Sequence, residues 1–347
     1  QSVPADEVRA STEAIIRAVV DRMPTLTVDP VEVEPLAELA RRRAEQGFPP
    51  EALTRSIQIT GRNVLAEVDR LAAEEGVDAA LLLRLHDVLW QFATDAASVI
   101  ATINHDIAVD IGRLEGEHRS EFLRALLRGA LPPQQIRVEA RNFGLDATIP
   151  YYPVRTRPSD DKDATRLSLL IARTGATHSH RPVVATIDDD VVALAPQRPG
   201  VEDSTSVVIA VGEPAMLDDA AEQFRAATLA LESGLAFGRT GVLTLQDLGA
   251  LPVILLVDDH AAMMQRQYLV DLDVDQGANL EIARTVWAWL ECDQNVDEVA
   301  GRMHCHRNTV RYRLTRFKEL TGLDLNRTDD LITAWLALGR RAAAREL

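Results

Sequence analysis

Apolar residues in the first third of the chain recur at spacings of three and four. From residue 1 to about residue 130 the strand-forming residues do not alternate with polar ones, so the pattern predicts helices throughout this region. Gly47 ends one predicted helix. Phe48-Pro49-Pro50 begins the next, since proline in a first helical turn loses no hydrogen bond.

A second helix stop and start falls at Gly76 and Asp78, and a long helical pattern follows. This pattern ends at Gly129 and Pro132-Pro133, where the sequence predicts the first domain boundary. Its apolar stripe from Val99 to Leu127 is a candidate contact between two copies of the chain.

Short β-branched runs separated by helical patterns fill residues 134 to 275 and predict an α/β or α+β domain. Two of the runs flank Asp188-Asp189-Asp190, which indicates a hairpin, and residues 217–238 predict a helix. Residues 152–166 are polar and suggest a linker. The predicted strands are RLSLLIAR (166–173), RPVVATI (181–187), DVVALAP (190–196) and TSVVIAV (205–211).

Three short helices are predicted near the end of the chain, over residues 280–291, 296–303 and 307–320. Asn295 can cap the second, and a turn at His304-Cys305-His306 leads to the third. Two helices joined by so short a turn are typical of a helix-turn-helix. His304 stands where glycine is commonest in that turn.

A helical projection of the third helix separates a buried face from a polar one. With Val310 pointing inward, Leu314 and Phe317 also point inward, because successive residues advance by 100°. Polar side chains on the opposite face and arginines at its margins are the composition of a recognition helix, which reads base edges and holds phosphates. The predicted DNA-binding residues are Arg307, Asn308, Thr309, Arg311, Tyr312, Thr315 and Arg316.

The charge distribution limits where DNA can bind. The chain has a net charge of −16, so a protein that coats nucleic acid over its whole surface is excluded. Residues 280–347 contain eleven basic and ten acidic residues, and the stretch 302–318 contains six basic residues and no acid. A basic amphipathic helix can also simply face solvent, but this one is the third helix of a three-helix unit in an acidic chain.

The composition also indicates the cellular compartment of the protein. No apolar run is long enough to span a bilayer, and the first residues lack the features of a signal peptide. Cys292 and Cys305 are the only two cysteines, which excludes a disulfide framework. We therefore expect a cytoplasmic bacterial protein with no membrane partner.

Residues 306–338, HRNTVRYRLTRFKELTGLDLNRTDDLITAWLAL, resemble the C-terminal domain of PucR and CdaR type regulators. This resemblance implies a Fis-like helix-turn-helix that binds double-stranded operator DNA. It also implies a transcription regulator that responds to a small metabolite of a catabolic pathway. The matching residues are His306, Arg307, Asn308, Thr309, Tyr312, Arg313, Leu314, Thr321 and Gly322.

Upstream segments extend the resemblance. Residues 121–154 and 207–255 look like the family's central domain, which is similar to a degenerate GGDEF fold of the ferredoxin-like, cyclase-like class, and residues 40–65 are similar to RsbR-like helical sensors. The expected fold class is multidomain α + α/β. The expected domains are an all-helical sensor-like domain (1–130), a GGDEF-like α/β domain (131–275) and the helix-turn-helix domain (276–347).

An enzyme is the main alternative, as a signalling protein with a nucleotide-binding or residual cyclase-type central domain. A catalytic GGDEF hairpin needs glycines so that phosphates can approach the backbone. The hairpin ATIDDDVVAL has none, and three acids at a hairpin tip favour a solvated turn over a metal site. We expect no catalytic residue and no enzyme. A protein-binding module like the stressosome proteins would not need the basic helix.

Other candidate ligands have simpler interpretations. His178 and His180 favour a surface loop over a metal site, since no further ligand is near in sequence. Cys305 is most simply a core residue, with a redox switch as the alternative. RsbR-like sensors are similar to globins, so His86 and His105 are candidate haem ligands, although few aromatic residues are present to line a haem pocket. We expect no metal and no cofactor. We also expect a homodimer or larger homo-oligomer, because one short helix reads few bases.

Overall fold

The computed structural model describes residues 34–45, 50–201, 207–272 and 277–347, together with Arg9, Glu13 and Arg17. The chain divides into two compact units, Gln1–Gly116 and Glu117–Leu347. Most of residues 1–33, the helix stop predicted at Gly47, and Phe48-Pro49 lie outside the described residues.

The described part of the first unit is helical, as the apolar spacing predicts. It contains α2 (Glu34–Glu45), α3 (Pro50–Glu75) and the first part of α4 (Ala79–Leu127). Gly76, with φ of 66°, ends α3, and α4 begins directly after Asp78. Ala40 of α2 packs in one apolar cluster with Ala96, Ile100 and Ile103 of α4.

A mixed five-stranded sheet organises the second unit, in the order β2-β3-β1-β4-β5. β4 and β5 are parallel, and the other neighbouring strands are antiparallel. The fold class expected from the sequence, multidomain α + α/β, is confirmed. The strands are β1 (Tyr152–Thr156), β2 (Val183–Ile187), β3 (Asp190–Ala195), β4 (Val208–Val211) and β5 (Gly241–Leu243).

The predicted hairpin is present between β2 and β3. Ile187 pairs with Asp190, and Asp188 and Asp189 form the two-residue turn with φ of 51° and 67°. Two positive φ values are what a type I′ turn needs, and aspartate tolerates them better than most residues.

Two sequence predictions for this region are wrong. Residues 166–173, predicted as a strand, lie in α6 (Asp161–Thr174), where Leu167 and Ile171 are four residues apart and both buried. Asp160 caps this helix by accepting a hydrogen bond from the Asp163 N–H. The predicted linker at 152–166 instead forms β1 and the start of α6. Periodicity alone does not separate a short apolar run in a buried helix from a strand.

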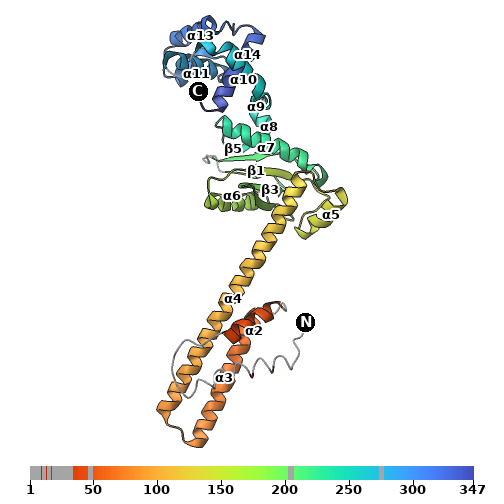
Figure 1. The fold of residues 1–347 in the computed structure, drawn as a ribbon, viewed down its shortest axis with the longest axis vertical. Helices are drawn as coiled ribbons and strands as arrows, with labels where there is room; N and C mark the ends of the chain where they lie inside the picture. The colour runs from red at the N-terminus through yellow and green to blue at the C-terminus, as the bar shows by residue number, and fades with distance from the viewer. Residues whose placement is uncertain are drawn as a thin grey trace. The chain divides into compact units, whose positions relative to one another are not determined.

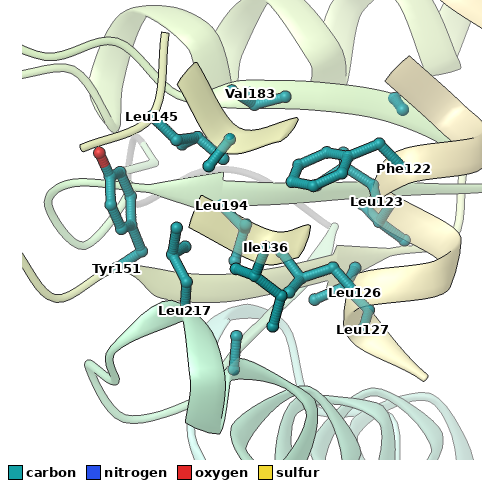
Figure 2. Packing of buried hydrophobic residues seen from close by; sticks show 14 of the residues in the cluster. Phe122, Leu123, Leu126, Leu127, Ile136, Leu145, Tyr151, Val183, Leu194 and Leu217 are labelled. Atoms are coloured by element: carbon teal, nitrogen blue, oxygen red, sulfur yellow. The ribbon is translucent and has the colours of Figure 1, made fainter. Parts of the chain in front are cut away.

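Helices cover both faces of the sheet (Figure 1). α6 covers the face that contains Val191 and Ile209, whereas α7 (Ala220–Ala236) packs on Val208 and Ala210 of the opposite face. The last turns of α4 and the helix α5 (Pro133–Asn142) also pack on that opposite face. They are joined there by η1 (Leu217–Asp219), the short helix that directly precedes α7. Figure 2 shows the side chains of this cluster, which include Phe122, Leu123, Leu126, Ile136, Leu194 and Leu217.

The chain continues from β5 into a group of helices. Ile254, Leu269 and Leu272 are buried in the same core as Val286 and Phe317, so the helices on either side of residues 273–276 pack together. These elements are α8 (Leu245–Leu248), α9 (Leu251–Leu256), α10 (Asp258–Tyr268), η2 (Val270–Leu272), α11 (Gly277–Glu291), α12 (Val296–Arg302), α13 (Arg307–Thr321) and α14 (Thr328–Ala343).

Gly339 of α14 lies where this core leaves no room for a side chain. A β-carbon there would collide with the terminal methyl of Ile254 and contact the ring of Trp287.

Within the part of the chain that the structure describes, no helix has both the length and the apolar character needed to cross a membrane.

Candidate nucleic-acid interface

α12, a short turn and α13 form the predicted helix-turn-helix. Val299 of α12 and Val310 of α13 are fully buried in one cluster with Ala288 and Trp289 of α11. Asn295 caps α12 as predicted, because its side-chain oxygen accepts hydrogen bonds from the N–H groups of Asp297 and Glu298 at 3.0 and 3.3 Å.

The turn between the two helices depends on two histidines. His304 has φ of 50°, in the left-handed region where glycine is favoured, which explains why glycine is commonest there. The N-cap of α13 is His306, whose Nδ1 accepts a hydrogen bond from the Asn308 N–H at 3.2 Å. The sequence did not indicate this cap, since histidine is not among the usual N-cap residues. Gly322, with φ of 75°, ends the helix as predicted.

The two faces of α13 separate as the projection predicts. Val310 and Phe317 are fully buried, and Leu314 is partly buried in the same helix group. Tyr312 is 67% exposed, an unusual position for a large aromatic side chain. Thr309 is half-buried. The exposed residues of the predicted set are Arg307, Asn308, Arg311, Tyr312, Thr315 and Arg316.

Four of these residues form a continuous stripe along the helix. Asn308, Arg311, Tyr312 and Thr315 follow the spacing i, i+3, i+4 and i+7, which places them on one side of α13. Their shared exposure, opposite the buried Val310, gives the surface a row of hydrogen-bonding groups. We call these four residues the exposed stripe.

The arginines on this surface differ in their partners. Arg307 Nε lies 3.5 Å from an Asp297 carboxylate oxygen, and Arg316 Nη1 donates a hydrogen bond to Glu319 at 2.7 Å. The side chain of Arg311 has no hydrogen-bond or ion-pair partner among the described residues, while its backbone carbonyl accepts a hydrogen bond from the Thr315 hydroxyl at 3.1 Å.

Three other basic residues of the stretch 302–318 stabilise the domain itself. Arg313 is 19% exposed and donates a hydrogen bond to the Thr285 hydroxyl at 3.0 Å. Arg302 pairs with Glu291 at 2.7 Å. The ammonium of Lys318 donates to Asp324 at 2.7 Å and, together with two hydrogen bonds from Asn326, lowers the pKa of Asp324 to about 2. Local sequence does not distinguish these three basic residues from Arg311 of the exposed stripe.

The hairpin acids differ in their environments. Asp188 is exposed and lies 3.2 Å from Arg128. Asp190 is buried, with Arg155 at 2.7 Å and Arg157 at 2.9 Å from its two carboxylate oxygens. The solvated-turn interpretation is therefore wrong for Asp190. Its carboxylate, at the start of β3, pairs with Arg155 of β1 and with Arg157 just beyond the end of β1.

The histidines and cysteines considered as ligands have ordinary surroundings. His86 Nε2 lies 2.8 Å from an Asp69 oxygen, so the helix histidine has a partner. His178 is exposed in a loop, as predicted, and His180 lies 3.6 Å from Asp146. Cys305 packs partly buried in the helix-turn-helix core. Across the described ranges, no group of three or more histidine, cysteine or acidic residues is arranged to hold a metal ion.

Three family models match successive segments that together make up most of the chain. Residues 282–339 match the PucR C-terminal helix-turn-helix domain, residues 128–233 match the GGDEF-like domain, and residues 1–119 match the N-terminal domain of the RsbT co-antagonist protein rsbRD. The chain therefore contains a helix-turn-helix domain of the PucR type, a GGDEF-like domain and an rsbRD-type N-terminal domain. The resemblance inferred from HRNT-x-x-YRL is thus confirmed, together with its central and N-terminal extensions.

Relatives with assigned names are regulators. The chain is 35% identical over 102 residues to the transcriptional activator PmfR of Paenarthrobacter nicotinovorans, which is 29% of this chain and 21% of that protein. It is 40% identical over 57 residues to the carbohydrate diacid regulator of Escherichia coli, 16% of this chain and 15% of that protein. The aligned segments therefore span about a fifth or less of either relative.

Two longer matches are more distant. An uncharacterised protein of Mycobacterium tuberculosis is 25% identical over 300 residues, which cover 79% of this chain and 71% of that protein. The crystal structure of a regulator of polyketide synthase expression from Bifidobacterium adolescentis covers 65% of this chain and 97% of that one, at 20% identity. Its TM-score is 0.31, too low for a detailed comparison.

Proposed function

We propose that this chain is a sequence-specific DNA-binding transcription regulator that inserts α13 into the major groove. The observation that supports this most directly is the exposed stripe on the second helix of a helix-turn-helix, opposite the fully buried Val310 and Phe317. The PucR-type domain match and the regulator relatives support the same function. DNA is in the cytoplasm of bacteria, so we propose that the protein acts there.

Each exposed residue has a role suited to its chemistry. Arg311 holds a phosphate, with Arg307 and Arg316 as outer phosphate contacts. Tyr312, Thr315 and the half-buried Thr309 contribute hydrogen bonds to base edges or the adjacent backbone.

Asn308 is the proposed base-reading residue. It lies in the first turn of α13, the part of a recognition helix that usually contacts base edges, and a side-chain amide can form two hydrogen bonds with adenine. The alternative role for Asn308 is to cap the helix. His306 occupies the N-cap position instead, and only the backbone N–H of Asn308 takes part in that cap.

The proposal assigns no catalysis to the central domain. A metal-dependent cyclase hairpin needs carboxylates free to hold the ion. Asp190 is instead buried between Arg155 and Arg157, and the hairpin tip has aspartates where phosphate-binding glycines would be needed.

We further propose that the protein binds DNA as a homodimer or larger homo-oligomer, through α4. Phe122, Leu123 and Leu126 are buried in the core of the second unit, so the contact must use apolar residues that remain exposed on α4. Within the stripe from Val99 to Leu127, Val109 and Leu114 are 54% and 50% exposed and are the candidates. The two half-sites are then about one helical turn of DNA apart, or a multiple of it.

We propose a small-molecule effector, which the name of the carbohydrate diacid regulator supports as a class without indicating the compound. The working domain boundaries are 1–130 for the helical sensor-like domain, 131–275 for the GGDEF-like domain and 276–347 for the DNA-binding domain.

The test is selection of bound sequences from random duplex DNA with the full chain. We expect one recovered motif with two related half-sites. Asn308→Ala should then lose about 1–3 kcal/mol of discrimination at one base pair in a panel of single-base operator changes, while non-specific binding barely changes. Recovery of no common motif would contradict the proposed function. If Asn308→Ala lowers thermal stability but keeps every operator preference, the residue is structural.

A further inference from the structure

The arginines on the proposed DNA surface are held in two different ways. Arg307 and Arg316 lie at the two ends of the surface, and each has a carboxylate partner, Asp297 and Glu319 respectively. Arg311 lies between them and has no such partner among the described residues. The outer two positive charges are therefore already matched before any DNA arrives.

Both carboxylates are exposed and positioned to meet DNA. The Asp297 side chain is 69% exposed and lies in the first turn of α12, the helix that crosses the DNA backbone when a helix-turn-helix docks. The Glu319 side chain is 55% exposed, one turn beyond Arg316 on α13. A phosphate that approaches either arginine meets a negative charge at the same place.

We propose that Asp297 and Glu319 compete with DNA phosphates for Arg307 and Arg316 and so keep sequence-independent affinity low. This inference rests on the proposed function. Non-specific binding comes almost entirely from neutralisation of phosphates. Its affinity therefore falls most when two of the three arginines on this surface must first separate from a carboxylate. Base contacts from the exposed stripe do not involve either carboxylate, so operator recognition is affected less. The net effect is a larger ratio of specific to non-specific affinity.

The size of the effect follows from the exposure of the pairs. Exposed ion pairs are weak, so the removal of one carboxylate should strengthen binding by about two- to fivefold and not by orders of magnitude. The dependence of affinity on salt should also become steeper, by up to about 0.9 in the log–log slope, as each released arginine neutralises one more phosphate.

The experiment measures binding of the full chain to a duplex that lacks the selected operator, at several salt concentrations between about 50 and 200 mM. Asp297→Asn and Glu319→Gln should each bind this duplex two- to fivefold more tightly than the unaltered chain, with a steeper slope. Their ratio of operator to non-operator affinity should fall. Glu298→Gln is the matched control, because Glu298 is a neighbouring exposed acid in the same turn of α12 without an ion-pair partner among the described residues.

A double-mutant cycle decides whether the arginine is the intermediary. In an Arg307→Ala background, Asp297→Asn should produce no gain. An equal gain in that background, an equal gain from Glu298→Gln, or no gain at all would each overturn the proposal. These outcomes presuppose that the unaltered chain binds duplex DNA. If it binds none, the proposed function itself fails, which separates the two conclusions.

Discussion

Arg311 and Arg313 are two residues apart on α13, yet their replacement by alanine should have opposite consequences. The Arg311 side chain is exposed and has no hydrogen-bond or ion-pair partner among the described residues, whereas the Arg313 side chain contacts α11 and is 19% exposed. The Arg311→Ala change should affect DNA binding alone. The Arg313→Ala change should affect the stability of the domain.

The magnitude for Arg311 comes from counterion release. One lost phosphate contact lowers the log–log salt slope by about 0.9. Between about 50 and 200 mM salt, the unaltered chain should therefore lose about 3.5-fold more affinity than Arg311→Ala. The free energy of unfolding should change by less than about 0.5 kcal/mol, as for other surface substitutions.

The magnitude for Arg313 comes from its contacts. Its guanidinium donates to the hydroxyl of the fully buried Thr285 at 3.0 Å and lies 3.3 Å from Glu281. Loss of one charged hydrogen bond to a buried group, with modest help from the partly exposed ion pair, should cost about 1–3 kcal/mol of unfolding free energy. Arg313→Lys keeps the positive charge but not the guanidinium group that reaches both partners. It should therefore lower the free energy of unfolding by less than Arg313→Ala.

Urea denaturation and salt-dependent fluorescence anisotropy on the same two variants provide the assay. Binding is measured at a temperature where both variants are folded. Two results would contradict these roles: a lower salt slope with unchanged stability in Arg313→Ala, or a destabilised fold with an unchanged slope in Arg311→Ala. Either result would mean that the two side chains have exchanged roles relative to this structure.

Three further changes test the packing and electrostatics of the second unit. Gly339→Ala should lower the unfolding free energy by about 1–3 kcal/mol in urea denaturation, because the added methyl collides with Ile254; an unchanged midpoint would contradict that packing. Asp190→Asn should cost about 1–3 kcal/mol by calorimetry, since two partly exposed arginines lose their buried counter-charge, and a neutral result would argue against the ion-pair network. Asp324 has a folded-state pKa of about 2, below its ordinary 3.8, so its stabilising contribution is complete above about pH 4 and is lost as the pH falls toward 2. Asp324→Asn should flatten the acid limb of the stability curve over that window, and an unaltered limb would contradict the pairing with Lys318.

The sequence by itself determined the local elements of the helix-turn-helix domain. The period of Val310, Leu314 and Phe317 defined the buried face of α13, and Asn295 and Gly322 marked the start of α12 and the end of α13. These features depend on residues three or four apart or on a single cap, so the local pattern contains the whole signal.

Tertiary structure decided which charged groups are free. Arg311 and Arg313 have the same side chain and nearly the same neighbours in sequence, but only Arg313 faces Thr285, 28 residues away. Asp190 is buried because Arg155, 35 residues earlier, lies on the adjacent strand. Residues 166–173 are apolar enough for either a strand or a helix, and they form α6 because Leu167 and Ile171 pack on the sheet. In each case the deciding partner is distant in sequence, and only the folded chain brings it into contact.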